Sequence, residues 1–304
     1  MLITGGCGFI GANLVPHLVE KGFNVKILDN LSIGSTEYIQ LENVEFIEGD
    51  IRDEVVVDKA LEGVNTIVHL AASGSVVESI KNPMENFDIN VKGTLNLLQR
   101  AVKANINKFI FASTGGALMG DTPPPVNENS LPDPISPYGA SKLCCESYCK
   151  AFTGSYGINT IMLRFGNIYG PFSSHKKGVI TAFIKALQNN QELTIYGDGE
   201  ASRDFLYVDD LVNGIHSAIE KDISGSSIFH LASEKETSIK QLANHLIDIS
   251  GNKDVNINYK EHRTGEVERT FAEFKKANEI LGFYPQINVR KGLEKTWEWF
   301  EGDK

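Results

Sequence analysis

The chain has 304 residues, of which 41% are apolar and 22% charged, a composition typical of a globular protein with a buried core. Its formal net charge of -10 argues against a nucleic-acid or anionic-membrane surface, because the long-range field of the protein repels phosphates. No apolar run reaches the roughly 20 residues that a membrane-spanning helix needs. We therefore expect a cytoplasmic protein without nucleic-acid or membrane partners.

Short apolar runs alternate with amphipathic segments from residue 1 to about residue 165. Buried parallel strands are typically continuous apolar runs, and they need helical crossovers between them. The runs expected to form strands are LIT, NVKILD, VEFIEGD, TIVHLAA, KFIFAS and NTIMLRF. The two longest amphipathic segments, residues 84–105 and 138–152, are expected to be helices. This alternation predicts the α/β class, with a Rossmann-type doubly wound parallel sheet over residues 1–165.

Beyond residue 165 the alternation loosens. A helix is expected over residues 179–190 and a strand over residues 193–197. We expect residues 166–203 and 233–304 to form a smaller α/β substrate-binding domain, with about 204–232 returning to the first domain.

The four cysteines indicate no metal centre. They are Cys7, Cys144, Cys145 and Cys149, without a CxxC pair or a histidine close in sequence. We expect them to be small, reduced, mostly buried side chains, with no metal bound and no disulfide formed.

A glycine-rich turn opens the chain. Gly5, Gly8 and Gly11 recur at intervals of three between the first apolar run and an amphipathic helix. Glycines here permit a tight turn and let a pyrophosphate approach the amides at the N-terminus of the helix. Phe9 and Ile10, within the turn, are therefore also candidate cofactor contacts. Because strand, turn and helix occur in the required order, the motif predicts dinucleotide binding.

Acidic residues end the next two apolar runs. Asp29 lies 18 residues after Gly11, where a carboxylate can accept hydrogen bonds from the adenosine ribose and repels a 2′-phosphate. No Lys or Arg occurs from Asn30 to Gly34, so NAD is favoured over NADP. Asp50 and the following Ile51 are candidates for the adenine edge. The alternative for Asp50 is an N-cap of the following helix.

Tyr138 and Lys142 are four residues apart in Ser-Pro-Tyr-Gly-Ala-Ser-Lys, so they share one face of the expected helix. A phenol is a poor base at neutral pH, but a nearby ammonium and an oxidised nicotinamide both favour the phenolate. Alone, such a pair is usually a surface feature. The glycine turn and an apolar run ending in Ser113-Thr114 favour a catalytic pair instead.

The strings TGGCGFIG, HLAAS, SPYGASK, LRFGNIYGP, SRDFLYVDD and EHRTGEVERT resemble, in order and spacing, the extended short-chain dehydrogenases, and most of all UDP-galactose 4-epimerases. The resemblance covers nearly the whole chain. It implies an NAD-dependent enzyme that epimerises UDP-hexoses at C4 through a transient 4-keto sugar.

The resemblance also implies the catalytic triad, namely Tyr138, Lys142 and a Ser or Thr at the end of the fifth strand. Gly115 stands where many relatives keep that hydroxyl, so Thr114, and after it Ser113, is expected to replace it. Lys142 would also bind the nicotinamide ribose. The remaining cofactor contacts implied are Leu70, Ala71, Ala72 and Asn90.

The substrate residues that the resemblance implies lie mostly beyond residue 165. They are Asn167, Gly178, Val179, Tyr196, Arg203, Arg263 and Glu266. In an acidic protein, Arg203 and Arg263 stand out as residues able to grip a diphosphate. Thr270 matches a gate beside the sugar C2 substituent, where a bulky tyrosine excludes an N-acetyl group. We expect threonine to admit it, unless Thr270 merely faces solvent.

Other functions remain open from sequence alone. A 4,6-dehydratase, a decarboxylase or a UDP-glucuronate epimerase would share the oxidation step. Dehydratases of the family carry an Asp-Glu pair where this chain has Gly115-Gly116. A non-catalytic NAD- or nucleotide-sensing protein on the same fold is a hypothesis of another class.

A homodimer is also implied, joined through the helices at about residues 84–104 and 136–155 as a four-helix bundle. Apolar residues at helical spacing agree with it, although the same stripe could pack on the sheet. They are Phe87, Val91, Leu95, Leu98 and Val102.

Overall fold

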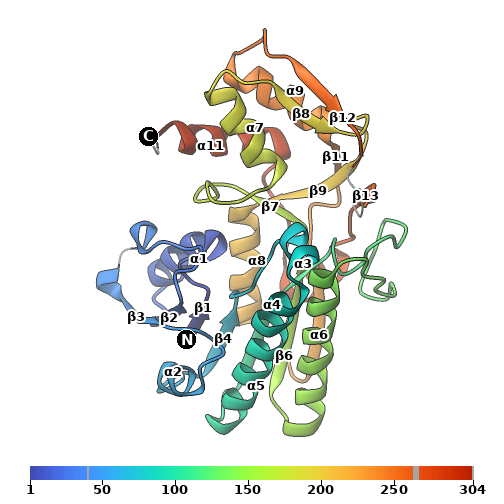
Figure 1. Cartoon of the computed structure of the whole chain (residues 1–304). Coiled ribbons are helices and arrows are strands. Elements are labelled where there is room, and N and C mark those ends of the chain that lie inside the picture. The colour runs from blue at the N-terminus through green and yellow to red at the C-terminus, as the bar shows by residue number, and fades with distance from the viewer. Residues whose placement is uncertain (40, 263–266, 303–304) are drawn as a thin grey trace.

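A seven-stranded parallel sheet forms the centre of the computed structural model, which describes residues 1–39, 41–262 and 267–302 (Figure 1). Its strand order is β10-β6-β5-β4-β1-β2-β3. The order reverses at β1, so the sheet is doubly wound as predicted. The strands are β1 (Leu2–Thr4), β2 (Val25–Asp29), β3 (Val44–Glu48), β4 (Thr66–His69), β5 (Lys108–Thr114), β6 (Asn159–Phe165) and β10 (Ser226–Leu231).

Helices cover both faces of this sheet (Figure 1). On one face α1 packs against α8, and on the other α5 packs against α2 and α6. The α5 side chains Leu97, Leu98 and Ala101 are fully buried, and burying a leucine contributes roughly 1.5–3 kcal/mol. These helices are α1 (Phe9–Glu20), α2 (Glu54–Ala60), α3 (Val76–Lys81), α4 (Pro83–Phe87), α5 (Gly93–Lys103), α6 (Pro137–Tyr156) and α8 (Val208–Glu220).

The remaining elements gather beyond the carboxyl ends of the large sheet's strands (Figure 1). The strands among these remaining elements are β7 (Asn167–Tyr169), β8 (Leu193–Tyr196), β9 (Ser202–Tyr207), β11 (Glu236–Ser238), β12 (Ile257–Lys260) and β13 (Arg269–Thr270). The helices among them are α7 (Val179–Gln188), α9 (Ile239–Ser250) and α11 (Val289–Gly302), while α10 (Lys275–Leu281) packs on β10. Among the described residues, no helix is long and apolar enough to cross a bilayer.

Residues 204–207, at the start of the segment of about 204–232 that was expected to return to the first domain, belong to β9, which pairs with β7, β11 and β13. The chain returns with α8 and β10. An apolar strand pairs equally well in either sheet, so its side chains do not identify its neighbours.

The apolar stripe on residues 87–102 is divided between two environments. Val91 and Leu98 are buried, whereas Phe87 is 42% exposed. Leu95 and Val102 are partly buried against the core. The stripe therefore packs on the molecule along its length and leaves apolar surface near its start.

His69, at the end of β4, is a buried neutral histidine. Its Nδ1 lies 2.6 Å from the Thr4 hydroxyl and its Nε2 2.9 Å from the Thr94 hydroxyl. Burial, helped by the charge of Lys142, lowers the pKa of His69 to about 3. Below pH 6.5 the unfolded chain binds a proton here that the folded chain does not, so stability falls as pH drops toward 3.

We expect His69→Gln to flatten this acid slope. The free-energy difference between wild type and variant should shrink by about 1.4 kcal/mol for each pH unit between 6 and 4. Urea unfolding of both proteins at several pH values measures it. Parallel stability curves would show that His69 does not stay neutral.

Candidate active site

The glycine turn forms a close-packed cradle between β1 and α1. Gly5 has φ +68°, and a Cβ on it would lie 2.6 Å from the backbone nitrogen of Ala71. A Cβ on Gly11 would overlap the backbone of Gly6. Gly8 is the N-cap of α1 and no side chain caps that end, so the amides beginning at Phe9 are free to bind an anion.

Asp29 is held in place by the same turn. Its carboxylate accepts hydrogen bonds from the backbone nitrogens of Cys7 and Leu31, both at 2.9 Å. The side chain is nearly buried at the carboxyl end of β2. This is where the ribose of a dinucleotide bound at the glycine turn would be expected.

The side-chain amide of Asn30, the residue after Asp29, donates a hydrogen bond of 3.0 Å to Asp50. Arg52 binds Asp50 through two parallel hydrogen bonds of 2.8 and 2.7 Å. These bonds lower the pKa of Asp50 to about 2. The N-cap alternative for Asp50 is wrong, because Asp53 caps α2 by accepting from Val55 and Val56. Ile51, next in the chain, is buried.

The segment after β4 borders the glycine turn. The Leu70 nitrogen donates to the Thr4 carbonyl at 3.0 Å, and the Ala71 nitrogen reaches the Thr4 hydroxyl at 3.3 Å. Ala72, like these two, is partly exposed. Asn90 fixes the continuation, because its side chain accepts from the Ser73 nitrogen at 2.8 Å and donates to the Ser73 carbonyl at 3.1 Å.

Helix α6 brings Tyr138 into the middle of this arrangement. The helix begins there because the Ser136 hydroxyl caps it by accepting from Gly139, and Pro137 occupies the first turn. Thr114, at the end of β5, lies close to the Tyr138 side chain and favours its ionised form. Burial is the larger influence and raises the pKa of Tyr138 to about 12. The protein alone therefore keeps this phenol neutral.

Lys142 lies one turn further along α6. Its Nζ donates to the Ala112 carbonyl at 2.8 Å and lies 5.9 Å from the centre of the Tyr138 ring. Burial lowers the pKa of Lys142 to about 8. Tyr138, Lys142 and Thr114 thus converge at the carboxyl end of β5.

Ser113 does not join them. Its hydroxyl donates to the buried carboxylate of Glu146 at 2.6 Å. Successive residues of a strand point to opposite sides, so Ser113 and Thr114 have different partners. This contact favours Thr114 over Ser113 as the catalytic hydroxyl.

The predicted substrate residues lie in the elements beyond the carboxyl ends of the large sheet's strands (Figure 1). The Asn167 amide donates to the Asp204 carbonyl at 3.3 Å. Gly178 is the N-cap of α7, which begins at Val179 and has no side-chain cap. Tyr196 ends β8 and is partly exposed.

Arg203, in β9, donates to the carbonyls of Ser202 and Glu268 at 2.8 and 3.1 Å. It therefore joins β9 to the segment that follows residue 266. Arg263 and Glu266 lie outside the described residues.

Thr270 lies close to the segment that follows β5. It lies level with Arg203 in the pairing of β13 with β9. Its hydroxyl is buried, has no hydrogen-bond partner among the described residues, and lies 3.9 Å from where a Cβ on Gly116 would lie. The residue as a whole is partly exposed, but the buried hydroxyl does not favour the alternative in which Thr270 merely faces solvent.

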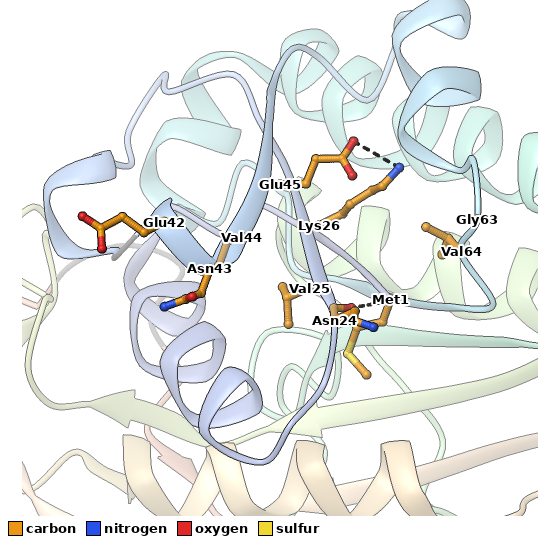
Figure 2. A pocket seen from close by; sticks show the side chains of 10 residues that line it. All are labelled: Met1, Asn24, Val25, Lys26, Glu42, Asn43, Val44, Glu45, Gly63 and Val64. Atoms are coloured by element: carbon orange, nitrogen blue, oxygen red, sulfur yellow. Dashed lines mark hydrogen bonds and ion pairs between the residues drawn. The ribbon is translucent and has the colours of Figure 1, made fainter.

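A hollow of about 370 Å³ lies at the opposite end of the sheet (Figure 2). It is lined by Met1, Asn24, Val25, Lys26, Glu42, Asn43, Val44, Glu45, Gly63 and Val64. These residues precede or begin β1 to β4, and the Lys26–Glu45 ion pair of 3.2 Å spans it. Ligands of open α/β sheets bind beyond the carboxyl ends of the strands, so this hollow is not the active site.

The fold and the converging Tyr, Lys and Thr define a dinucleotide-dependent enzyme of the short-chain dehydrogenase type. A model of the NAD dependent epimerase/dehydratase family matches residues 1–232. The chain belongs to this family and is an NAD-dependent enzyme.

Three solved structures are close in both sequence and fold. UDP-glucose 4-epimerase of Thermotoga maritima, solved with UDP-glucose, is 36% identical with a TM-score of 0.95, covering 99% of this chain and 98% of that one. UDP-N-acetylglucosamine 4-epimerase of Methanobrevibacter ruminantium, in complex with UDP-N-acetylmuramic acid, is 32% identical with a TM-score of 0.93, covering 100% and 98%. UDP-glucuronic acid 4-epimerase of Bacillus cereus, with UDP-glucuronic acid and NAD, is 30% identical with a TM-score of 0.93, covering 100% and 99%.

Proposed function

We propose that this enzyme is a 4-epimerase of UDP-hexoses that acts on UDP-glucose and UDP-galactose and also on their N-acetylated counterparts. The observation that carries the proposal is the contact of Tyr138 with Thr114, one residue before the Gly115-Gly116 pair. This arrangement supplies a proton carrier for one hydroxyl and no further acid or base directly after the threonine.

The chemistry follows from three side chains. The Tyr138 oxygen takes the proton of the sugar C4 hydroxyl and later returns it, while Thr114 lies beside the phenol. Lys142 places a positive charge near the phenol and favours its ionised form. NAD bound at the glycine turn would supply the acceptor and then the donor of the C4 hydride, which would allow inversion at C4 without net oxidation.

The glycine pair argues against dehydration. Removing water across C5 and C6 needs an acid and a base beside those carbons, and Gly115 and Gly116 provide neither. The hypothesis of a non-catalytic nucleotide sensor does not fit the intact pair, in which Lys142 is buried and Tyr138 is partly exposed.

The cofactor and substrate residues divide between the two sides of the cleft. We propose a NAD-binding domain of residues 1–165 with 208–232, and a sugar-nucleotide domain of the remainder. The NAD contacts proposed are Gly5, Gly8, Phe9, Ile10, Gly11, Asp29, Asn30, Asp50, Ile51, Leu70, Ala71, Ala72, Asn90, Tyr138 and Lys142. The substrate contacts proposed are Asn167, Gly178, Val179, Tyr196, Arg203, Arg263, Glu266 and Thr270.

A panel of sugar nucleotides tests the reaction. The purified enzyme is incubated with UDP-, dTDP- and GDP-linked sugars, and products are identified by NMR. Interconversion of UDP-glucose with UDP-galactose is expected. A 4-keto-6-deoxy product or a pentose product would instead assign a dehydratase or a decarboxylase.

Thr270 is expected to set the breadth of substrate. Its small side chain beside Gly116 leaves space that a ring would fill, and packed sites resist added volume. We expect Thr270→Tyr to abolish turnover of UDP-GlcNAc and UDP-GalNAc while retaining UDP-Glc and UDP-Gal. Thr270→Val, of similar size, should keep both pairs. If folded Thr270→Tyr still epimerises the N-acetylated pair as well as before, Thr270 is not the gate.

We also propose that the enzyme is a homodimer joined through α4, α5 and α6. Exposed apolar side chains on α4, and on α3, which packs against α4 and α6, support the proposal: Val77, Ile80, Met84 and Phe87 are 42–69% exposed. Contiguous exposed apolar residues commonly mark an interface. Light scattering at micromolar concentration should give twice the chain mass of 33.4 kDa, and a monomer would contradict the proposal.

A further inference from the structure

The loop from Gly170 to Gly178, between β7 and α7, reaches across to the NAD side of the cleft. The Asn13 amide of α1 donates to the Pro171 carbonyl at 3.2 Å. The Phe172 ring packs between Tyr38, at 4.8 Å between ring centres, and Trp299 of α11, at 5.3 Å. The loop is thus fixed to the glycine-turn helix and to the segment that follows Asp29.

The backbone of this loop is a tight, specified turn. Phe172 has φ +63°, an uncommon conformation for a residue with a side chain, and it persists only where surrounding contacts impose it. Ser173 is buried and its hydroxyl donates to the Gly170 carbonyl at 2.6 Å. These contacts determine where Lys176, three residues later, must lie.

Lys176 points its ammonium at the start of α1. The Nζ lies 4.6 Å from the centre of the Phe9 ring and donates to the Ile168 carbonyl at 3.0 Å. Within residues 1–39, 41–262 and 267–302, no carboxylate forms an ion pair with it. Burial lowers the pKa of Lys176 to about 8.

Lys176 is partly buried, and a carbonyl oxygen and an aromatic ring lie beside its ammonium. Because no described carboxylate neutralises the charge, a bound anion would gain a charge-assisted hydrogen bond here. The anion that belongs at this place is a diphosphate, because the uncapped amides of α1 begin at Phe9. The ring of Phe9 keeps one side of the ammonium dry, which strengthens its attraction to a phosphate.

We propose that Lys176 is a diphosphate-binding residue, and that the Gly170–Gly178 loop delivers it from the substrate side of the cleft to the phosphates held at α1. Both NAD and, under the function proposed above, the nucleotide sugar carry a diphosphate. The position over Phe9 favours that of NAD. The loop would then couple the substrate side of the molecule to retention of the cofactor.

The test compares Lys176→Met with Lys177→Met, a matched control at the neighbouring residue. Lys177 is 82% exposed and pairs with Glu78 at 3.3 Å. Dissociation of NAD from the holoenzyme is followed with a coupled dehydrogenase that consumes released NAD. UDP binding to the NAD-loaded protein is measured by calorimetry.

We expect Lys176→Met to release NAD at least about tenfold faster, because a charge-assisted hydrogen bond is lost. Lys176→Arg should remain near wild type, and so should Lys177→Met. Weaker UDP binding with unchanged NAD release would support the same role toward the diphosphate of the sugar nucleotide.

Unchanged NAD release and unchanged UDP affinity in folded Lys176→Met would overturn the proposal. So would an equal loss in Lys177→Met, because the effect would then be general. Should Lys176→Met fail to fold, Lys176→Gln, which keeps a polar end group, replaces it in the same comparison. None of these readouts depends on which sugar is epimerised, so failure here is distinct from failure of the proposed reaction.

Discussion

Tyr138→Phe is expected to reduce turnover by at least about a hundredfold while leaving the fold and the NAD content nearly unchanged, since general acid–base help is typically worth 10² to 10⁴. The ring remains to fill its place on α6, and the loss is confined to one oxygen. That oxygen lies beside Thr114, and the two residues that follow, Gly115 and Gly116, carry no side chain that could replace it.

The measurement is initial-rate epimerisation with matched NAD content in each preparation. Tyr148→Phe is the control, because Tyr148 lies on the same helix, ten residues after Tyr138, and is exposed. Near-normal turnover in Tyr138→Phe would contradict the proposed mechanism. A comparable loss in Tyr148→Phe would show that the assay reports on helix α6 rather than on the phenol.

The large sheet could be predicted from sequence because its strands carry a local signal. Parallel strands covered by helices on both faces are unbroken apolar runs, and β5 and β6 are buried along nearly their whole length. The glycine turn and the Tyr138–Lys142 pair are local too. Each is defined by the spacing of residues that are close in sequence, so it can be recognised without knowledge of the fold.

Partnerships between distant segments could not be predicted in the same way. Ser113 and Thr114 offer the same chemical group, and only the packing of α6 on β5 gives one to Glu146 and the other to Tyr138. Lys176 and Lys177 are adjacent lysines, a pattern typical of an exposed loop. The position of the Lys176 ammonium depends on Phe9, which is 167 residues earlier in the chain.

Asp50 was ambiguous for a different reason. A carboxylate before a helix can cap it or pair with a nearby cation, and the two roles need the same residue type. The structure gives the cap to Asp53 and pairs Asp50 with Arg52. Only the side-chain geometry distinguishes the two outcomes.

A buried ion pair anchors the helix that carries the catalytic residues. Glu146, one turn beyond Lys142 on α6, binds Arg164 of β6 through two hydrogen bonds of 3.0 and 2.8 Å. Both side chains are less than 5% exposed, and the Ser113 hydroxyl also donates to Glu146. Removing one partner leaves the other charge buried and unpaired, which costs more than the pair contributes.

Arg164→Met is therefore expected to lower the free energy of unfolding by about 3–5 kcal/mol. The double variant Glu146→Gln with Arg164→Met should recover much of that loss, because no unpaired charge remains. Arg290→Met is the surface control: Arg290 pairs with Glu294 at 3.3 Å, both are about half exposed, and the cost should stay below about 1 kcal/mol. Urea unfolding measures all three. If the double variant is no more stable than Arg164→Met alone, the loss comes from packing, and the stranded charge of Glu146 is not its cause.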